Sequence, residues 1–463
     1  MKRRKKTAIS MQKKRWRGTL PTALSVNYEG GEKNMDNSCR ILAAGQSVTN
    51  DTWQTGLNNN DLIIGPSGSG KTRGYVKPNI LQCNESMIIA DTKGALCEEV
   101  GGALEQEGYK VIELNLSDCA QSSYGYNPLA YIRRDLSGRY SELDILALAA
   151  CLVPIETKRD PYWETMSRIY LESAISYVLE CLPPEEQNFA SVVRLVGETG
   201  PGGCYRNLMR ELAVINPESF ALARYRMYQP VADNASTTSS CIHSFLASKL
   251  APLSFEGAKR LFTNPKKINI KEIGRKKTAV FLTVSDTDNS LYRLANVFYT
   301  QALHTLCDLA DKNKEHRLKV PVRFYLDDFA SNVTIPEFDR IISVIRSREI
   351  SVSVIIQSLS QLESIYGRAR AMTIVNNCDN LICLGAGRDM ETAGYISKQA
   401  NTPVSAVLNA PLDSAWLLTR GSAAQKVKKY DLKAHPLYHR LPEAEQAEER
   451  KKSKAAMQPE TMA

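Results

Sequence analysis

The chain has 463 residues, of which 43% are apolar and 24% charged, a composition typical of a globular protein that buries a sizeable core and more than one domain. Its eleven cysteines form no CxxC pair and no cluster with histidine, so they suggest neither a zinc site nor a disulfide scaffold, and a reducing cytosol fits best. The net charge of +9 comes from residues 1–17, which carry nine Lys and Arg and no acid; the remainder balances at 50 basic against 50 acidic residues.

The basic N-terminal arm, residues 1–38, is expected to be disordered. Three interpretations are open: a solvated tail, a tether to anionic lipid or nucleic acid, or sequence upstream of the true start. The third rests on residues 29–34, Glu-Gly-Gly-Glu-Lys-Asn, whose purine-rich codons would resemble a bacterial ribosome-binding site just before Met35. The sequence contains no signal-peptide h-region and no apolar run near the ~20 residues that cross a bilayer.

Seven short apolar runs follow, and each stops at a polar residue or glycine. Continuous rather than alternating apolar strands are typical of a parallel sheet that helices cover on both faces. Ligands bind beyond the carboxyl ends of such strands, so we expect the terminators Gly65, Asp91, Ser285, Asp327 and Gln357 to share one edge. The predicted strands are 62–65, 87–91, 111–115, 278–285, 324–327, 352–357 and 381–385.

The alternation of strands and helices fails between Leu116 and Thr278. Asp160-Pro161 can start a helix, apolar residues then recur at helical spacing, and Pro183-Pro184 ends the run. Further helices are predicted at 189–197, 217–228 and 236–250.

These patterns predict an α/β fold with a mostly parallel sheet and an inserted all-helical domain. After the arm, the predicted parts are 39–155 and 263–440 for the two pieces of the nucleotide-binding domain, 156–262 for the inserted helical domain, and 441–463 for a charged tail expected to be disordered.

The strongest motif is a phosphate-binding loop that matches GxxxxGK[ST], with a predicted strand before it and a predicted helix after it. The glycines let backbone N–H groups face phosphates, the lysine reaches the β and γ oxygens of ATP, and the threonine supplies a ligand to Mg²⁺. A chance match would occur in on the order of one in fifty chains this long. The residues are Gly65, Pro66, Ser67, Gly68, Ser69, Gly70, Lys71 and Thr72.

A P-loop needs an acid from a neighbouring strand to hold Mg²⁺ and a group that positions the attacking water. The stretch FYLDDF, residues 324–329, is the best candidate in the chain. Asp327 is predicted to be the acid on the Mg²⁺ side, and Asp328 the base that orients water. The alternative is a capped strand end followed by a turn.

Two further strand ends carry candidate groups. Gln357 follows the strand after Asp327 and is predicted to sense the γ-phosphate or the attacking water, or else to belong to a polar helix start. The segment Asp91-Thr-Lys93-Gly94 has two interpretations. Lys93 is predicted to contact nucleotide or a phosphate backbone, or else Asp91 caps the next helix in a simple turn.

Residues 334–337, Thr-Ile-Pro-Glu, have the spacing of a capping box and predict a helix through DRIISVIRSRE. That helix would place Arg346 and Arg348 in its last turn. Either arginine could complement the helix dipole, or one could be an arginine finger that enters the site of a neighbouring subunit.

Together these segments resemble the VirD4/TraG family of type IV coupling proteins, the hexameric ATPases that feed relaxase-bound single-stranded DNA and proteins into conjugation and secretion channels. The P-loop is shared by many families, but its combination with DTKG, YNPL and IIQSxSQL is specific. The matching segments run in order across most of residues 40–390: NNNDLIIGPSGSGKT (58–72), IIADTKGAL (88–96), YNPL (126–129), DPYWE (160–164), YLDDFA (325–330), RSREISVSVIIQSLSQL (346–362) and LICLGAG (381–387).

The resemblance implies that Lys71 and Thr72 bind ATP and Mg²⁺, that Asp327 is the Walker B aspartate and that Gln357 senses the nucleotide. It implies single-stranded DNA, the relaxase and the secretion channel as partners, a homo-hexamer, and a cytoplasmic location at the inner face of the bacterial plasma membrane. Two features depart from the family: no transmembrane helix precedes the P-loop, and Asp328 stands where the family usually has glutamate.

The predicted function is therefore an ATP-driven coupling protein. Because the carboxylate of Asp328 is one methylene shorter than that of glutamate, a slowly hydrolysing, nucleotide-gated receptor for the relaxosome is the alternative. A related double-stranded DNA translocase is a third possibility, although it leaves DTKG and YNPL unexplained.

Overall fold

The computed structural model describes residues 38–156, 159–198, 204–285, 287–329, 334–446 and 449. The predictions for the basic arm before Ser38, including the start at Met35, lie outside the described residues.

The main sheet of the described residues has nine strands in the order β11-β10-β9-β3-β8-β7-β4-β6-β5. The strands from β9 to β5 are parallel, and each of them coincides with one of the predicted apolar runs. The antiparallel hairpin of β10 and β11 extends one edge. The strands are β3 (Asp61–Ile64), β4 (Ser86–Asp91), β5 (Lys110–Asn115), β6 (Thr278–Thr283), β7 (Val322–Leu326), β8 (Ile350–Ile356), β9 (Asn380–Cys383), β10 (Ser414–Thr419) and β11 (Gln425–Lys428).

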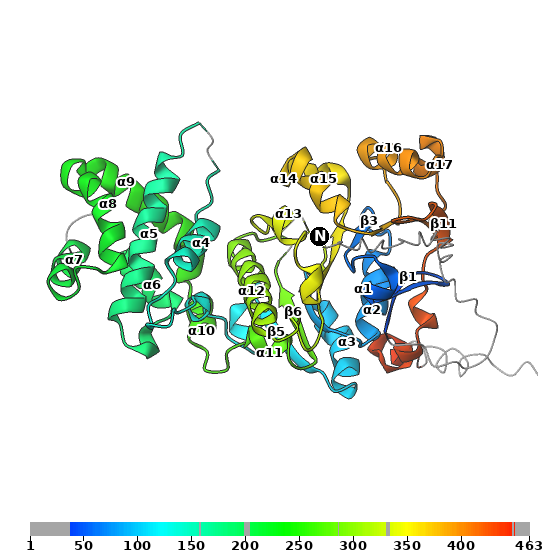
Figure 1. Ribbon diagram of the computed structural model, residues 1–463, viewed down its shortest axis with the longest axis horizontal. Helices are drawn as coiled ribbons and strands as arrows, with labels where there is room; N and C mark the ends of the chain where they lie inside the picture. Colours follow the sequence, from blue (N-terminus) through cyan, green and yellow to red (C-terminus); the bar gives the residue numbers. More distant parts are fainter. Residues whose placement is uncertain are drawn as a thin grey trace, which may run out of the picture.

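Helices cover both faces of this sheet, as the continuous apolar strands predict (Figure 1). Successive residues of β3 show the reason: Leu62 and Ile64 pack into one apolar cluster, and Ile63 packs into another on the opposite face. A separate two-stranded hairpin, β1 (Cys39–Ala43) and β2 (Gln46–Thr49), precedes the sheet. The helices of this part are α1 (Thr52–Thr55), α2 (Lys77–Leu81), α3 (Ala95–Gln106), α11 (Ile270–Ile273), α12 (Tyr292–Lys312), α13 (Phe338–Ile341), α14 (Leu359–Tyr366), α15 (Arg368–Asn376), α16 (Met390–Gln399) and α17 (Val404–Leu408).

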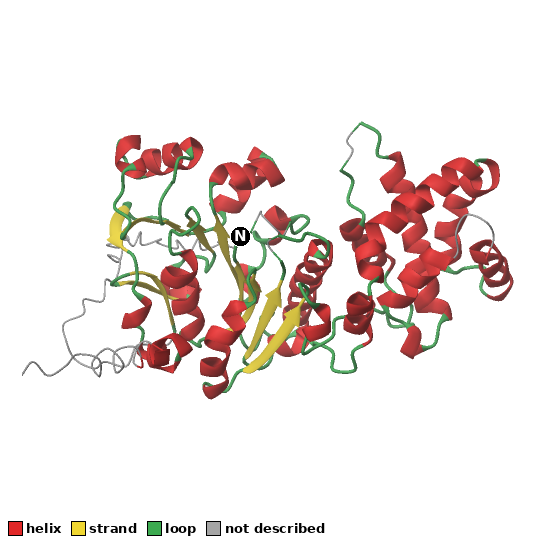
Figure 2. Ribbon diagram, turned by 180° about the vertical axis from the view of Figure 1, so that it is seen from behind, coloured by secondary structure: helices red, strands yellow, loops and turns green. Residues whose placement is uncertain are grey.

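A group of helices lies to one side of the sheet, and Figure 2 shows it without strands. The predicted helices at 189–197, 217–228 and 236–250 appear as α6, α8 and α9, and the helix predicted after Asp160 begins at Tyr162. The group confirms the inserted helical domain of the fold class, whereas its boundaries at 156 and 262 stay a prediction. Its helices are α4 (Glu142–Leu152), α5 (Tyr162–Cys181), α6 (Phe189–Glu198), α7 (Cys204–Ile215), α8 (Phe220–Asn234), α9 (Ser236–Leu250) and α10 (Glu256–Thr263).

The long helix predicted from Thr334 is wrong. Glu337 adopts φ 55°, which a right-handed helix does not allow, so α13 lasts only four residues before turns and a 3-10 turn at Arg346–Arg348. The backbone N–H of Thr334 instead donates to Asn296 Oδ1 at 2.9 Å. The apolar spacing indicates burial correctly, because Ile335, Phe338, Ile342 and Ile345 are all buried.

The disordered tail predicted from residue 441 is wrong in its first part. Leu441 and Ala444 are buried, and Glu443 accepts a hydrogen bond from Arg73 at 2.6 Å. Leu441 packs into the apolar cluster that contains Tyr75 and Val76 of the P-loop helix, a contact that the charged composition of the tail conceals. Residues 447, 448 and 450–463 lie outside the described part.

Candidate nucleotide-binding site

The P-loop follows β3 at the carboxyl edge of the sheet and has the backbone that its glycines predict. Gly68 and Gly70 adopt φ of 75° and 90°, in the left-handed region that favours glycine. A Cβ atom at Gly65 would lie 2.4 Å from Ser69 Oγ, so this position must also lack a side chain. The backbone N–H of Gly65 donates to Ile356 O at 3.1 Å, which ties the loop to the end of β8.

The helix after the loop opens with a π-helical turn, Thr72–Val76. Pro78 lacks the N–H that would bond to the carbonyl of Gly74, and the N–H of Lys77 instead reaches five residues back to Thr72 O. The turn brings the hydroxyl of Tyr75 to 2.6 Å from Asp61 Oδ2, beneath the loop. The sequence signals a helix here but not its wider first turn.

Lys71 lies at the mouth of the loop. Its ammonium group donates to Gly65 O at 2.8 Å and to Pro66 O at 3.3 Å, and it lies 4.0 Å from Asp328 Oδ1. The residue is 8% exposed, so its charge sits where phosphate oxygens of a nucleotide would meet it.

Thr72 and Asp327 meet although they are 255 residues apart in the chain: the Thr72 hydroxyl donates to Asp327 Oδ2 at 3.1 Å. Burial raises the pKa of Asp327 to about 6, with a smaller contribution from Asp328, and Thr72 and Lys71 only partly offset this. A hydroxyl and a carboxylate oxygen are hard ligands of the kind that Mg²⁺ takes together with phosphate oxygens and water. These two residues therefore fit a Mg²⁺–nucleotide complex, and no cluster of three or more His, Cys, Asp or Glu among the described residues offers another metal site.

Asp328 has an unusual backbone. Its φ of 47° lies in the left-handed region, which aspartate tolerates better than most residues. Its N–H donates to Asp327 Oδ1 at 3.0 Å, and its own Oδ1 is buried with no hydrogen-bond partner among the described residues. The carboxylate of Asp328 thus faces the ammonium group of Lys71 and has one oxygen that accepts no hydrogen bond among the described residues.

Gln357 also lies at this edge. β8 runs between β3 and β7, and backbone bonds from Gly65 to Ile356 and from Phe329 to Ile355 flank its end. The side chain of Gln357 is exposed, while Ser358 caps α14 by accepting from the N–H of Gln361. The structure is compatible with Gln357 as a nucleotide sensor and with Gln357 as part of a polar helix start. Gln357 lies beside the P-loop, and it also directly precedes Ser358, the N-cap of α14.

Asp91 ends β4 and Lys93 follows it at the same edge. Asp91 accepts from the N–H groups of Leu96 and Cys97 at 2.8 and 3.2 Å, so it caps α3. Lys93 is exposed, and contact with nucleotide or a phosphate backbone stays a prediction.

Arg346 and Arg348 are not brought to this site within the chain. They precede β8, at the amino edge of the sheet. Arg348 donates to both carboxylate oxygens of Asp311, at 2.8 and 3.0 Å, whereas Arg346 donates to Thr52 O at 3.2 Å. Their proposed role would therefore require a neighbouring subunit.

Lys429, just after β11, is a contact that the sequence did not reveal. Its ammonium group donates to Ser69 O of the P-loop at 2.8 Å, and partial burial lowers its pKa. The next residue, Tyr430, places its carbonyl 3.7 Å from where a Cβ of Gly74 would lie. No motif marks Lys429, since it reaches the loop from 360 residues further along the chain.

The fold and this site define a P-loop nucleotide-binding protein of RecA-like architecture that carries an inserted helical domain. The family model described as "Type IV secretory system Conjugative DNA transfer" matches residues 31–402. The chain therefore belongs to this family, as its VirD4/TraG-like segments predict.

Named relatives agree with this assignment. "Protein VirD4" of Rhizobium radiobacter is 26% identical over 363 residues, covering 78% of this chain and 50% of the relative. "Conjugal transfer protein TraG" of Escherichia coli is 25% identical over 371 residues, covering 74% of this chain and 55% of the relative. The chain spans about half the length of the curated relatives that it matches.

Solved structures show the same fold. The unbound bacterial conjugative coupling protein TrwBdeltaN70 superposes with a TM-score of 0.62 at 17% identity, covering 84% of this chain and 88% of that chain. TrwB in complex with ADP and Mg²⁺ gives a TM-score of 0.61 at 17% identity, covering 85% of this chain and 88% of TrwB. VirB4 of Thermoanaerobacter pseudethanolicus gives 0.53 at 17% identity, covering 87% of this chain and 98% of VirB4.

Proposed function

We propose that this protein is an ATP-dependent coupling protein that recruits relaxase-bound single-stranded DNA, or a protein substrate, and drives it into a type IV secretion channel. The observation that carries the proposal is the 3.1 Å contact between Thr72 Oγ1 and Asp327 Oδ2, beside Lys71 on the same loop. The membership in a conjugative DNA transfer family and the ADP–Mg²⁺ complex of TrwB support it.

The chain's own groups divide the work of hydrolysis. The backbone N–H groups of residues 65–72 and the ammonium group of Lys71 hold the phosphates. Thr72 and Asp327 hold Mg²⁺, which neutralises charge on the β and γ oxygens when it is bound. Asp328 orients and deprotonates the attacking water, and Gln357 passes the state of the γ-phosphate to α14.

The assembly that we propose is a homo-hexameric ring at the inner face of the bacterial plasma membrane, with the secretion channel as partner. Arg346 is the better candidate for an arginine finger in trans, because its guanidinium binds only a backbone carbonyl among the described partners, whereas that of Arg348 is paired with Asp311. Within the described residues, no helix is both long and apolar enough to cross a bilayer.

A second candidate function is a nucleotide-gated receptor that docks the relaxosome and hydrolyses ATP slowly. The geometry of Asp328 favours it, since the carboxylate lies 4.0 Å from Lys71 Nζ and is one methylene shorter than glutamate. A misplacement of about 1 Å at a catalytic group can lower the rate on the order of 100-fold.

The test is ATP turnover by the full chain, alone and with single-stranded or double-stranded DNA. We expect turnover that single-stranded DNA stimulates and that Lys71→Ala abolishes, while Lys433→Ala, an exposed control, keeps it. Turnover that does not depend on Lys71 would contradict the proposal, and stimulation by double-stranded DNA alone would indicate a duplex translocase.

Two variants separate the motor from the receptor. If Asp328 is a working but short base, Asp328→Glu accelerates hydrolysis and Asp328→Asn abolishes it. If ATP binds tightly and neither variant changes a negligible rate, the receptor is correct and the role given to Asp328 is wrong.

A further inference from the structure

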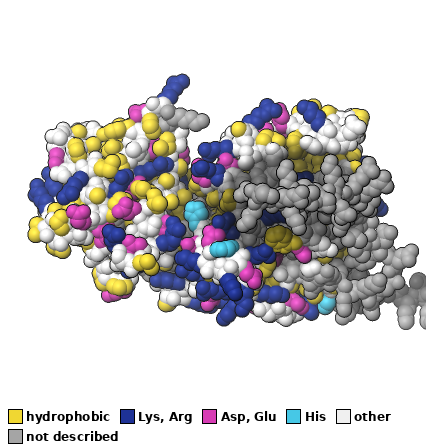
Figure 3. Space-filling view, in the orientation of Figure 1, with side chains coloured by type: hydrophobic (Ala, Val, Ile, Leu, Met, Phe, Trp, Pro, Cys, Tyr) yellow, Lys and Arg dark blue, Asp and Glu magenta, His cyan; other side chains and the backbone are white. Residues whose placement is uncertain are grey.

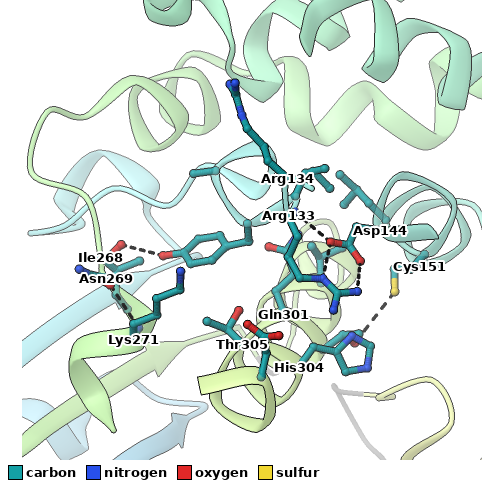
Figure 4. A pocket seen from close by; sticks show the side chains of 18 of the residues that line it. Arg133, Arg134, Asp144, Cys151, Ile268, Asn269, Lys271, Gln301, His304 and Thr305 are labelled. Carbon is teal, nitrogen blue, oxygen red and sulfur yellow. Dashed lines mark hydrogen bonds and ion pairs between the residues drawn. The ribbon is translucent and has the colours of Figure 1, made fainter. Parts of the chain in front are cut away.

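A cavity of about 590 Å³ opens between α4, α12 and the segment that joins α10 to α11. Its volume lies in the usual range of small-ligand sites. None of the described residues that line it belongs to the nucleotide-binding site. Figure 4 shows Gln301, His304 and Thr305 of α12 on one wall, with Arg133 and Asp144 facing each other on another.

The cavity lies where the chain passes between the sheet and the helical group. The chain leaves the sheet through the segment 130–152 and returns through 264–271, and residues of both connections line the cavity. The third wall, α12, packs on the sheet side, and α4 contacts both α12 and α5. A ligand held here would therefore touch both connections at once.

The lining has an excess of positive charge. It carries five cationic side chains against two acids. Both acids are already neutralised, since Arg133 binds Asp144 through two hydrogen bonds of 2.6 and 2.8 Å and Lys312 binds Asp308 at 2.7 Å. The cationic side chains are those of Arg133, Arg134, Lys267, Lys271 and Lys312.

Two ammonium groups remain for a ligand. Lys267 and Lys271 both line the cavity, and neither forms an ion pair with a carboxylate of the described residues. The guanidinium of Arg134 lies 4.1 Å from the ring centre of Tyr140 and points away from the cavity in Figure 4. His304 adds no charge at neutral pH, because burial and the neighbouring Arg133 lower its pKa.

The positive charge continues outside the cavity. Figure 3 shows Lys and Arg side chains gathered in the lower middle of the face in view, around α11. The acid of this segment, Glu272, is paired with Lys110 at 3.4 Å, so it does not neutralise the patch. The exposed cations of residues 264–277 are Lys266, Lys267, Lys271, Arg275, Lys276 and Lys277.

These features select a phosphate-bearing ligand. The guanidinium fork that would suit a carboxylate, Arg133, is already occupied by Asp144, and what remains are compact ammonium charges, which bind phosphate well. Apolar side chains of Ile132, Leu148 and Val297 line the cavity beside them and can cover a sugar or base.

We propose that Lys267 and Lys271 bind the phosphate of a nucleoside phosphate in this cavity, either free or within a single strand of nucleic acid, and that the bound ligand holds the helical group against the sheet. This cavity is separate from the ATP site at the P-loop, and binding of a phosphate in the cavity requires no ATP hydrolysis.

The experiment measures binding of inorganic phosphate, thymidine monophosphate and a fluorescent ten-nucleotide thymidine strand to the full chain, over a range of salt. All proteins carry Lys71→Ala, so that phosphate binding at the P-loop is weakened. The test variant combines Lys267→Glu and Lys271→Glu. The control combines Lys398→Glu and Lys426→Glu, which reverse the same charge on exposed residues of α16 and β11.

We expect the test variant to weaken binding of its ligand at least tenfold more than the control does. For the strand, the slope of log K against log salt should fall by about 0.7, since the one phosphate contact that is lost on a single strand contributes about 0.7. Binding of the strand alone identifies nucleic acid as the source, and binding of thymidine monophosphate or phosphate identifies a free ligand. The ligand should also slow hydrogen exchange in 130–152 and 264–271.

The proposal is overturned if none of the three ligands binds, or if the test variant and the control bind alike. Lys267→Gln with Lys271→Gln guards against damage from reversed charge, and it should show a smaller loss in the same direction. In the background with Lys71 intact, the test variant should keep its basal ATP turnover. A chain without Lys71-dependent turnover would refute the proposed function, yet phosphate binding in the cavity would stand.

Discussion

At the amino edge of the main sheet Asp61 begins β3, and at the carboxyl edge Asp327 follows β7; Asp61 is buried and Asp327 half-buried, and their surroundings differ in charge. Asp61 accepts from Arg40 Nε at 2.8 Å and from Tyr75 Oη at 2.6 Å. Burial alone would raise its pKa, but Arg40 and Arg323 outweigh burial, and the pKa is lowered. Asp327 is not paired with an arginine, and its pKa rises to about 6.

The comparison shows that burial does not decide the state of an acid. Both carboxyl groups lose hydration, which disfavours the charged form, and only the partners differ. Asp61 forms ion pairs with Arg40 and Arg323, so it stabilises the fold. Asp327 is not paired with an arginine, and Lys71 only partly offsets the effect of burial, so this site favours binding of a metal ion. The two edges therefore separate stability from function, and four experiments test this separation.

The largest expected effect is on the amino edge. Asp61→Asn leaves Arg40 and Arg323 buried without their shared counter-charge, so we expect a loss of about 3–5 kcal/mol in the free energy of unfolding. Urea denaturation measures it, with Glu391→Gln, an exposed residue of α16, as control. Turnover per folded molecule should be unchanged. A loss below about 1 kcal/mol would mean that the cluster does not stabilise the fold.

At the carboxyl edge, substitution of the aspartate should affect ATP turnover rather than stability. Asp327→Asn removes a carboxylate that the fold holds against its preference for the neutral form, so the free energy of unfolding should stay constant or rise by about 1 kcal/mol. ATP turnover should fall on the order of 100-fold, because the group that positions Mg²⁺ and the γ-phosphate is lost. A destabilised protein with normal turnover would reverse the assignment of the two edges.

The pH dependence distinguishes the two acids again. Since the pKa of Asp327 is raised to about 6, lowering the pH from 7 to 5 protonates it and should weaken the apparent Mg²⁺ affinity about tenfold. The stability that Asp61 provides is lost in a lower pH range: it is present above the pKa of an unfolded aspartate and is lost only as pH falls through the lowered pKa of the folded state. Titration of Mg²⁺-dependent nucleotide binding between pH 5 and 7 checks this, and Asp327→Asn should abolish the dependence.

The smallest effect concerns Lys429, whose ammonium group supports the P-loop from outside at Ser69 O. A hydrogen bond from a charged group contributes about 1.5–3 kcal/mol, and partial exposure reduces this, so Lys429→Met should weaken ATP binding about fivefold with little change in kcat. Lys429→Arg should recover part of the affinity. The neighbouring, exposed Lys428→Met is the matched control, and an equal loss in both variants would refute a specific role for Lys429.

Local signals in the sequence were enough to predict the elements that carry the site. The apolar runs correspond to the parallel strands, and GPSGSGKT predicts the loop that follows β3, in which Gly68 and Gly70 adopt positive φ. The acid pair that ends FYLDDF lies beside the loop, and the structure places Asp327 within hydrogen-bond reach of Thr72. These predictions succeed because a strand that ends at a polar residue is specified by neighbours in sequence.

Other features depended on contacts between distant segments. The capping-box pattern at 334–337 predicts a long helix, but side chains of other elements bind its first N–H groups and Glu337 turns left-handed. The tail from residue 441 looks too charged to pack, yet Leu441 and Ala444 are buried.

The sequence by itself therefore determined the order of strands and helices, the P-loop and the acids available to it, because each depends on residues that are close along the chain. Only the tertiary structure decided which aspartate is paired with arginine, which arginines lie far from the loop, and that Lys429 supports it. Those outcomes depend on the sheet order, which brings together groups that are 360 residues apart in the case of Lys429 and Ser69. Charge and hydrogen bonding act over a few ångströms in space, so no local pattern could encode them.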